Sequence, residues 1–331
     1  MRTARHMLVD TIDEWRHRQL VRMARYSVHT PLLGVARCLL ASGTLLALMV
    51  TPTTHLFYVS AARPTGLVCD GVAGYFGLFC LVPTQYLELA RWTAVTILLV
   101  VAVGWRPRIT GILHWWVSFS FYSSTNVMDG GDQVAAVITL LLIPICLTDN
   151  RRWHWYQNTE YRKDLSVGRV VSHMTLLLIW VQTSLLYLQS SVEKLKVPEW
   201  RDGTAVWYWL TMPPFGTSQF LHPIVAWLLS HGLIVLAATW GTIAIEFFVA
   251  CTLFAGHRLR RCAAILAIGL HTSIALVIGL PVFSMMMFAV LLLYHFRPGD
   301  PPLSLRNTRP LYRDHSTAEP TAEPIHNGTS P

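Results

Sequence analysis

The chain has 331 residues, of which 53% are apolar and 13% charged, and its mean hydropathy is +0.42. Soluble domains carry about 25% charged residues, so this composition excludes an ordinary globular protein of the cytosol; it also excludes a disordered chain, which needs low hydrophobicity. The 26 Lys and Arg exceed the 18 Asp and Glu, for a net charge of +8. These basic residues lie in short segments between apolar runs, not on one folded face, so we expect no nucleic-acid partner.

The first 31 residues form a basic arm. Six arginines precede residue 31 without an apolar run beside them, so we expect no cleavable signal peptide. Leu8, Ile12 and Trp15 fall at helical spacing, which is typical of a basic amphipathic helix on the inner leaflet of a membrane. A solvated cytoplasmic arm is the alternative.

Apolar runs of roughly twenty residues, the length that crosses a bilayer core, recur through residues 32–297. They predict an all-α protein, a polytopic membrane bundle of about eight transmembrane helices. Arg37 lies near the start of the first run, where we expect its long side chain to snorkel to the lipid headgroups. A short interfacial helix is expected at 223–230. The predicted spans are approximately 32–50, 87–104, 109–126, 133–148, 170 to 190 or 191, 233–255, 263–280 and 282–296.

The connections between the runs predict the orientation. Basic connections follow the second, fourth and sixth runs, whereas the connections at 129–132 and around Lys194 are acidic or mixed. Because Lys and Arg concentrate in cytoplasmic connections, both termini are predicted to be cytoplasmic and the Lys194 connection exterior. We therefore expect a multi-pass protein of the cell membrane, in contact with lipid.

Residues 298–331 differ from the rest of the chain. They are polar and rich in Pro, and Thr-Ala-Glu-Pro at 317–320 is repeated at 321–324. Such a segment buries too little apolar surface to offset its ordering entropy, so we expect a disordered and dispensable tail.

Two of the six cysteines, Cys69 and Cys80, lie in the predicted exterior connection 51–86, where oxidation is possible. A bridge between them would close a short loop and stabilise the segment by about 3 kcal/mol on the chain-entropy model. The alternative is two unpaired thiols in a loop that dips into the membrane. The pair lacks the Cys-x-x-Cys spacing of a redox-active site.

The fifth predicted span carries the strongest candidate site. Ser184, Tyr187, Ser191 and Lys194 recur at three- and four-residue steps, so they share one helix face. Lys194 ends this face at the predicted outer boundary of the membrane. An amine that is desolvated there would act as a base near neutral pH.

Two alternatives reduce Lys194 to a structural role. It either snorkels outward or pairs with a nearby carboxylate, Glu193 or Glu199. Glu246 lies in the middle of the sixth span, far from either water boundary, and is expected to be neutralised by His271 of the seventh span or by protonation.

Asp129, Asp132 and Gln133 begin the fourth span. A carboxylate at a helix N-terminus is stabilised by the free backbone N–H groups there. This explains one of the two aspartates and leaves the role of the other open. His114, in the third span, is expected to hydrogen bond between helices. No Walker loop, His-Glu-x-x-His zinc motif or serine elbow is found, so we expect no metal site. No inverted repeat of the transporter kind is evident.

These residues resemble the HTTM family, the membrane domain shared with vitamin K-dependent gamma-carboxylase. The resemblance rests on Val-Glu-Lys-Leu at 192–195, Trp-Arg-Asp-Gly at 200–203, and the order of Trp240, Glu246 and His271. It implies Lys194 as general base, Glu246 and His271 as its catalytic partners, and a reduced, vitamin K-like quinone as cofactor. The residues then expected to orient the base or bind substrate are Asp132, Gln133, Tyr187, Trp200 and Trp240.

The chain resembles more closely the sporulation-delaying protein B (SdpB) branch of that family. The motifs are Trp-Arg-Pro-Arg at 105–108, Gly-Gly-Asp-Gln at 130–133, Leu-Thr-Asp at 147–149 and Arg-Trp-His-Trp at 152–155, and the resemblance covers about 37–296. It implies a protein of the bacterial cytoplasmic membrane. Such a protein would act with a partner, SdpA, in maturing a secreted antimicrobial peptide toxin from its precursor.

The chain also departs from the carboxylase pattern. Asp132-Gln133 stands where the carboxylase has Asn-His, Glu193 replaces the first lysine, and we expect no counterpart of the large lumenal domain. Quinone chemistry and glutamate carboxylation therefore do not follow directly. We expect a membrane enzyme of toxin maturation with an outward-facing site around Lys194. The alternatives are a quinol-dependent carboxylase-like oxidoreductase and a non-catalytic scaffold that binds the toxin or its processing partner.

Overall fold

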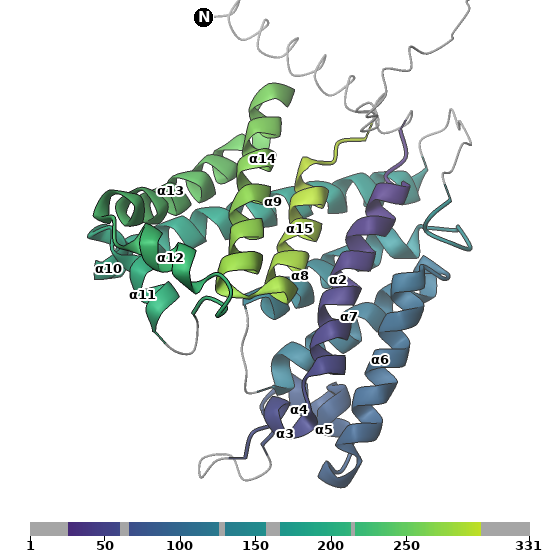
Figure 1. Cartoon of the computed structure of the whole chain (residues 1–331). Coiled ribbons are helices and arrows are strands. Elements are labelled where there is room, and N and C mark those ends of the chain that lie inside the picture. The colour runs from purple at the N-terminus through teal and green to yellow at the C-terminus, as the bar shows by residue number, and fades with distance from the viewer. Residues whose placement is uncertain (1–25, 60–65, 126–129, 157–165, 213–215, 299–331) are drawn as a thin grey trace, which may run out of the picture. The chain divides into compact units, whose positions relative to one another are not determined.

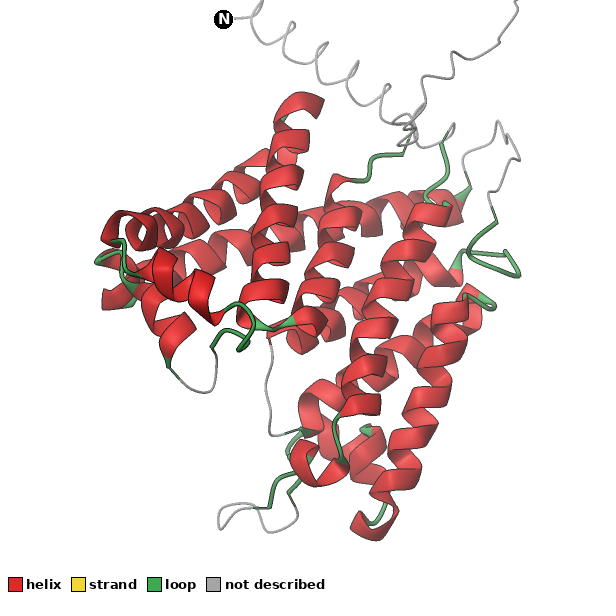
Figure 2. Ribbon diagram, in the orientation of Figure 1, coloured by secondary structure: helices red, strands yellow, loops and turns green. Residues whose placement is uncertain are grey.

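The computed structural model describes residues 26–59, 66–125, 130–156, 166–212 and 216–298. Throughout these ranges the secondary structure is helical, with no β-strand and one isolated bridge between Trp105 and Trp153 (Figure 2). Two units, Met1–Pro298 and Gly299–Pro331, make up the chain, and every described residue belongs to the first. The predictions for the basic arm and the tail fall largely on residues 1–25 and 299–331, outside the described ranges.

Eight main helices of the described part coincide with the eight predicted apolar runs (Figure 1), which confirms the all-α prediction. Within the described ranges, six helices are long and apolar enough to cross a membrane. The eight are α2 (Pro31–Val50), α6 (Leu87–Val103), α7 (Pro107–Ser124), α8 (Gly130–Leu147), α9 (Val167–Lys196), α13 (Gly232–Cys251), α14 (His257–Ser273) and α15 (Pro281–His295).

Helices α7 and α15 are outside that set of six. α15 has 15 residues and extends about 22 Å at 1.5 Å per residue, which is less than the roughly 30 Å of a bilayer core. α7 has 18 residues but carries His114 and several serines, which lower its hydropathy. The number of eight spans and the cytoplasmic termini therefore stay predictions.

Two apolar cores hold the helices together, and α2 contributes to both. Leu40 packs with residues of α8, α9, α13, α14 and α15 in the first core. Ala41 and Leu48 pack with residues of α6 and α7 in the second. Small residues let neighbouring membrane helices approach closely: a Cβ built on Gly111 of α7 would lie 2.5 Å from the Cβ of Cys146 on α8.

The connection between α2 and α6 contains the short helices α3 (Thr53–Leu56), α4 (Val72–Phe76) and α5 (Leu78–Leu81) and the turn η1 (Thr84–Tyr86). Cys69 and Cys80 lie with their sulfur atoms 2.04 Å apart and form a disulfide. The backbone N–H of Leu78 donates to the hydroxyl oxygen of Ser120, at 2.9 Å. The connection is thus tied both to itself and to α7.

The loop after α8 docks on the turn between α6 and α7, which brings together two of the sequence motifs. The N–H of Arg106 donates to the carbonyl of Arg152 at 2.8 Å, and the N–H of His154 donates to the carbonyl of Gly104 at 3.0 Å. Gly104 has a φ of 90°, and a Cβ there would lie 2.3 Å from a ring carbon of His154. Both the backbone conformation and the close ring require glycine.

The described residues between α9 and α13 form three short helices: α10 (Pro198–Arg201), α11 (Ala205–Thr211) and α12 (His222–Leu229). α12 coincides with the predicted short helix at 223–230, and its interfacial placement stays a prediction. The turn η2 (Thr252–Phe254) follows α13, and a π-helical turn η3 (Ile274–Ile278) follows α14.

Candidate functional site

A largely buried ion pair joins the end of α9 to α13. The Nζ atom of Lys194 lies 2.8 Å from each carboxylate oxygen of Glu246 and 2.7 Å from the hydroxyl oxygen of Ser190. The side chain of Lys194 is 20% exposed and that of Glu246 is 9% exposed. The attraction between two opposite charges that are buried together offsets part of the desolvation free energy that each charge would cost alone.

This pairing corrects two expectations. Lys194 does not pair with Glu193 or Glu199, because Glu193 bonds the Nζ atom of Lys196 at 2.7 Å on an exposed face. His271 is not the partner that neutralises Glu246. Helix α9 packs along α13, so the lysine at the end of α9 reaches the carboxylate first.

Trp200 lies beside the ion pair, and Trp240 lies beside the turn that follows Trp200. The ring centroid of Trp200, on α10, lies 5.3 Å from the Nζ atom of Lys194, a distance at which a ring face attracts a cation. Gly203 follows with a φ of 76°, and a Cβ there would lie 3.5 Å from a ring atom of Trp240 on α13. Trp240 therefore supports the chain that carries Trp200.

Tyr187 and His271 form a second buried pair beside the first. The phenol oxygen of Tyr187 lies 2.9 Å from Nε2 of His271, and both residues are at most 3% exposed. Nδ1 of His271 has no hydrogen-bond partner in the described part of the chain. The charge of Lys194 acts on His271 and that of Glu246 acts on Tyr187, so the four side chains form one electrostatic cluster.

Asp132 and Gln133, at the start of α8, have different surroundings. Asp132 is 6% exposed, whereas Gln133 is exposed. A Cβ on the preceding Gly131 would lie 3.1 Å from the Cα of Phe283, and the Phe283 ring centroid lies 5.6 Å from that of His271. The fold thus brings this turn of α8, but not the amide of Gln133, toward the histidine. Asp129 lies outside the described residues.

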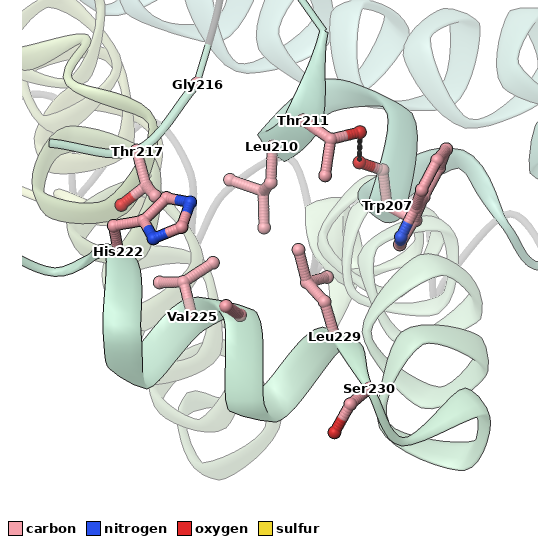
Figure 3. Close-up of a pocket in the computed structure, with 10 residues that line it drawn as sticks. Trp207, Leu210, Thr211, Gly216, Thr217, His222, Val225, Leu229 and Ser230 are labelled. Carbon is pink, nitrogen blue, oxygen red and sulfur yellow. Dashed lines mark hydrogen bonds between the residues drawn. The ribbon is translucent and has the colours of Figure 1, made fainter. Parts of the chain in front are cut away.

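A pocket of about 460 Å³ lies between α11 and α12 (Figure 3). Leu210 of α11 faces Val225 and Leu229 of α12 across it. No Asp, Glu, Lys or Arg side chain is among the described residues that line it. The hydroxyl of Thr217 is buried there without a hydrogen-bond partner in the described chain. An uncharged, largely apolar group suits such a lining.

The sequence did not predict this pocket, because its walls come from two separate short helices. The available signal was the aromatic run Trp-Tyr-Trp at 207–209, which is unusual for a polar connection. Within the described ranges, no group of three or more His, Cys, Asp or Glu side chains is arranged to hold a metal ion.

The geometry of the Lys194–Glu246 pair permits one specific proton transfer. A proton that passes from Nζ to a carboxylate oxygen, over the 2.8 Å between them, leaves a neutral amine and a neutral carboxyl. The neutral amine is then able to accept a proton from a bound group.

Two proteins of Bacillus subtilis (strain 168) are similar to the chain over most of its length. The uncharacterized protein YitO is 37% identical over 273 residues, which is 80% of this chain and 85% of that protein. Sporulation-delaying protein SdpB is 30% identical over 308 residues, which is 92% of this chain and 88% of that protein. The chain belongs to the SdpB family.

Membership of the SdpB family and six apolar helices make the chain a multi-pass protein of the bacterial cell membrane. No family model and no solved structure matches the chain. The wider HTTM relationship therefore stays a prediction that rests on the motifs.

Proposed function

We propose that this SdpB-family protein matures an exported antimicrobial peptide toxin at the membrane, together with an SdpA-like partner, and that Lys194 is its general base. The Lys194–Glu246 pair carries the proposal. Its amine lies 2.8 Å from both carboxylate oxygens, and the two residues belong to two apolar helices, α9 and α13. An ionisable pair that is largely shielded from water is costly compared with apolar packing, and ionisable residues on apolar helices are most often retained for function.

The neighbouring side chains have complementary roles in this proposal. Glu246 accepts the ammonium proton and so frees the amine of Lys194. Trp200, whose ring centroid lies 5.3 Å from Nζ, excludes water from the pair. Tyr187 and His271 offer a second hydrogen-bonding pair to the bound peptide, which enters from the exterior face.

A reduced quinone, the cofactor that the carboxylase resemblance implies, suits the pocket between α11 and α12. Leu210 and Leu229 would contact its apolar ring, and the hydroxyl of Thr217, which lacks a partner within the described residues, would donate to a ring oxygen. A bound quinol supplies reducing equivalents. A second candidate function is a quinol-dependent carboxylase-like oxidoreductase, for which this pocket would hold the quinol; the side chains of Lys194, Glu246 and His271 do not line the pocket. Quinone that co-purifies with the wild type and not with Leu229→Trp would support it.

Substitution of the lysine tests the first proposal. Cells that express the toxin precursor beside Lys194→Ala should release no mature toxin, with toxin release measured relative to the amount of the variant that is present in the membrane. Lys196→Ala is the matched control: it lies two residues away, is 64% exposed, and should release the normal amount. Normal release from Lys194→Ala would reject the base and leave the non-catalytic scaffold as the function.

A further inference from the structure

One face of α9 carries a regular seam that the other described helices leave open. Its five residues recur at steps of four and three: Leu178, Gln182, Leu185, Gln189 and Val192. Leu178 and Leu185 are each more than half exposed, and Gln189 and Val192 are exposed as well. Steps of four and three keep residues on the strip along which two helices pack, so α9 presents a packing surface for another helix.

The seam lies on the opposite side of α9 from the candidate site. At 3.6 residues per turn, Tyr187 is about 200° around the helix axis from Leu185. Tyr187 contacts His271 of α14, and Lys194 contacts Glu246 of α13. The seam therefore shares no residue with the site, and an inference about it is independent of the proposed function.

Two of the five seam residues are glutamines, and both lie within the predicted span from 170 to 190 or 191. Gln182 is at the middle of the 30-residue α9, about 21 Å from the nearer helix end at 1.5 Å per residue. Gln189 lies two turns later. The headgroups begin about 15 Å from the middle of a bilayer core, which is beyond the reach of the Gln182 side chain.

These amides differ from other exposed polar groups of the apolar helices. The hydroxyls of Thr242 on α13 and Thr272 on α14 each donate to a carbonyl four residues earlier in their own helix, at 2.9 and 2.7 Å. The amides of Gln182 and Gln189 form no hydrogen bond with any residue that the structure describes. Lipid tails offer neither donors nor acceptors, so an amide that stays unpaired there is costly.

We propose that this seam packs against the same seam of a second copy of the chain, so that the protein is a dimer in the membrane. A carboxamide both donates and accepts, so the glutamines of two copies satisfy one another across the helices. Copies that insert in the same orientation place equal residues at equal depths, as a two-fold axis along the membrane normal requires. The seam has no charged residue, so two copies meet without repulsion.

Sedimentation equilibrium of the full chain in density-matched detergent measures this association. The wild type should exchange between a monomer of 37.3 kDa and a dimer of twice that mass. Gln182→Leu combined with Gln189→Leu should raise the dissociation constant of the dimer about tenfold, because the hydrogen bonds between the helices are lost. Leucine suits an exposed position of an apolar helix, so this variant keeps its fold. Gln85→Leu, the same change at an exposed glutamine of η1, is the matched control and should leave the constant unchanged.

Oxidative cross-linking in membranes locates the interface. Leu185→Cys should give a covalent dimer. Leu266→Cys, at an exposed position of α14, is the control and should give no more dimer than the wild type, in which Cys251 and Cys262 are already exposed.

Three results would overturn the proposal: a wild type that stays monomeric at every concentration, a dissociation constant that the double glutamine variant leaves unchanged, or no cross-link of Leu185→Cys above the wild-type level. A Leu185→Cys protein that is cross-linked to a different protein, and not to a second copy, would overturn it too, because the seam would then bind another membrane helix.

Discussion

Removal of one partner of the Lys194–Glu246 pair should destabilise the protein far more than removal of both. Glu246→Gln leaves an ammonium that is only 20% exposed without its carboxylate, and breaking a buried pair from one side costs about 3–5 kcal/mol. Lys194→Met combined with Glu246→Leu removes both charges and keeps the volume. That double variant should have a free energy of unfolding near or above that of the wild type.

Unfolding of the solubilised protein by SDS, followed by tryptophan fluorescence, gives the free energy of unfolding of Glu246→Gln and of the four proteins of the double-mutant cycle: the wild type, Lys194→Met, Glu246→Leu and the double variant. The exposed pair of Lys196 and Glu193, whose side chains are 64% and 53% exposed, is the matched control, and Glu193→Gln should cost less than about 1 kcal/mol. Additive losses in the double variant, or a loss in Glu246→Gln as small as in Glu193→Gln, would refute the reasoning.

Three further predictions concern the loops. Cys69→Ser should lower the free energy of unfolding by about 3 kcal/mol, because the bridge closes a loop with a sequence separation of 11; a reductant should do the same to the wild type. Gly104→Ala should lower the free energy of unfolding by about 1–3 kcal/mol, because residue 104 has a φ of 90°. The loss should be larger if the His154 ring cannot move aside. Gly256→Ala is the control: no atom lies within 4 Å of its Cβ position, so it should lose little stability in the same thermal unfolding assay. Burial lowers the pKa of His154 to about 3 in the folded protein, whereas the pKa is about 6.5 in the unfolded chain. As the pH drops below about 6.5, the unfolded chain therefore binds a proton first, and the free energy of unfolding should fall. His154→Gln should make that fall smaller in a series of unfolding midpoints measured at different pH values.

The helices were predictable because each apolar run is long enough to be read from composition alone. The predicted ends of α2 and α8 lie within one residue of the observed ends at Val50 and Leu147, whereas the predicted end of α9 at 190 or 191 falls short of the observed end at Lys196. The sequence did not predict the burial of Arg37, which is 1% exposed and donates to His154 of the loop after α8, because hydropathy near a helix end does not say whether a distant loop covers that end. The docked loop depends on contacts between residues about fifty positions apart, such as Arg106 with Arg152.

The candidate site could be predicted only in part, because the sequence shows which residues share a helix face but not which helix packs against that face. Helical spacing put Tyr187 and Lys194 on one face of α9, and the structure places Lys194 against Glu246 of α13 and Tyr187 against His271 of α14. The partner of each was not predictable, because spacing along one helix does not determine which helix packs against it. Glu246 therefore pairs with Lys194 and His271 with Tyr187, instead of with each other.

The most direct test of the account separates stability from function in one variant. The protein with both Lys194→Met and Glu246→Leu should fold and insert like the wild type, because no charge is left unpaired. We expect cells that carry it with the toxin precursor to release no mature toxin, since the amine is gone. Full toxin release from this stable variant would contradict Lys194 as the base and would leave the ion pair a purely structural contact.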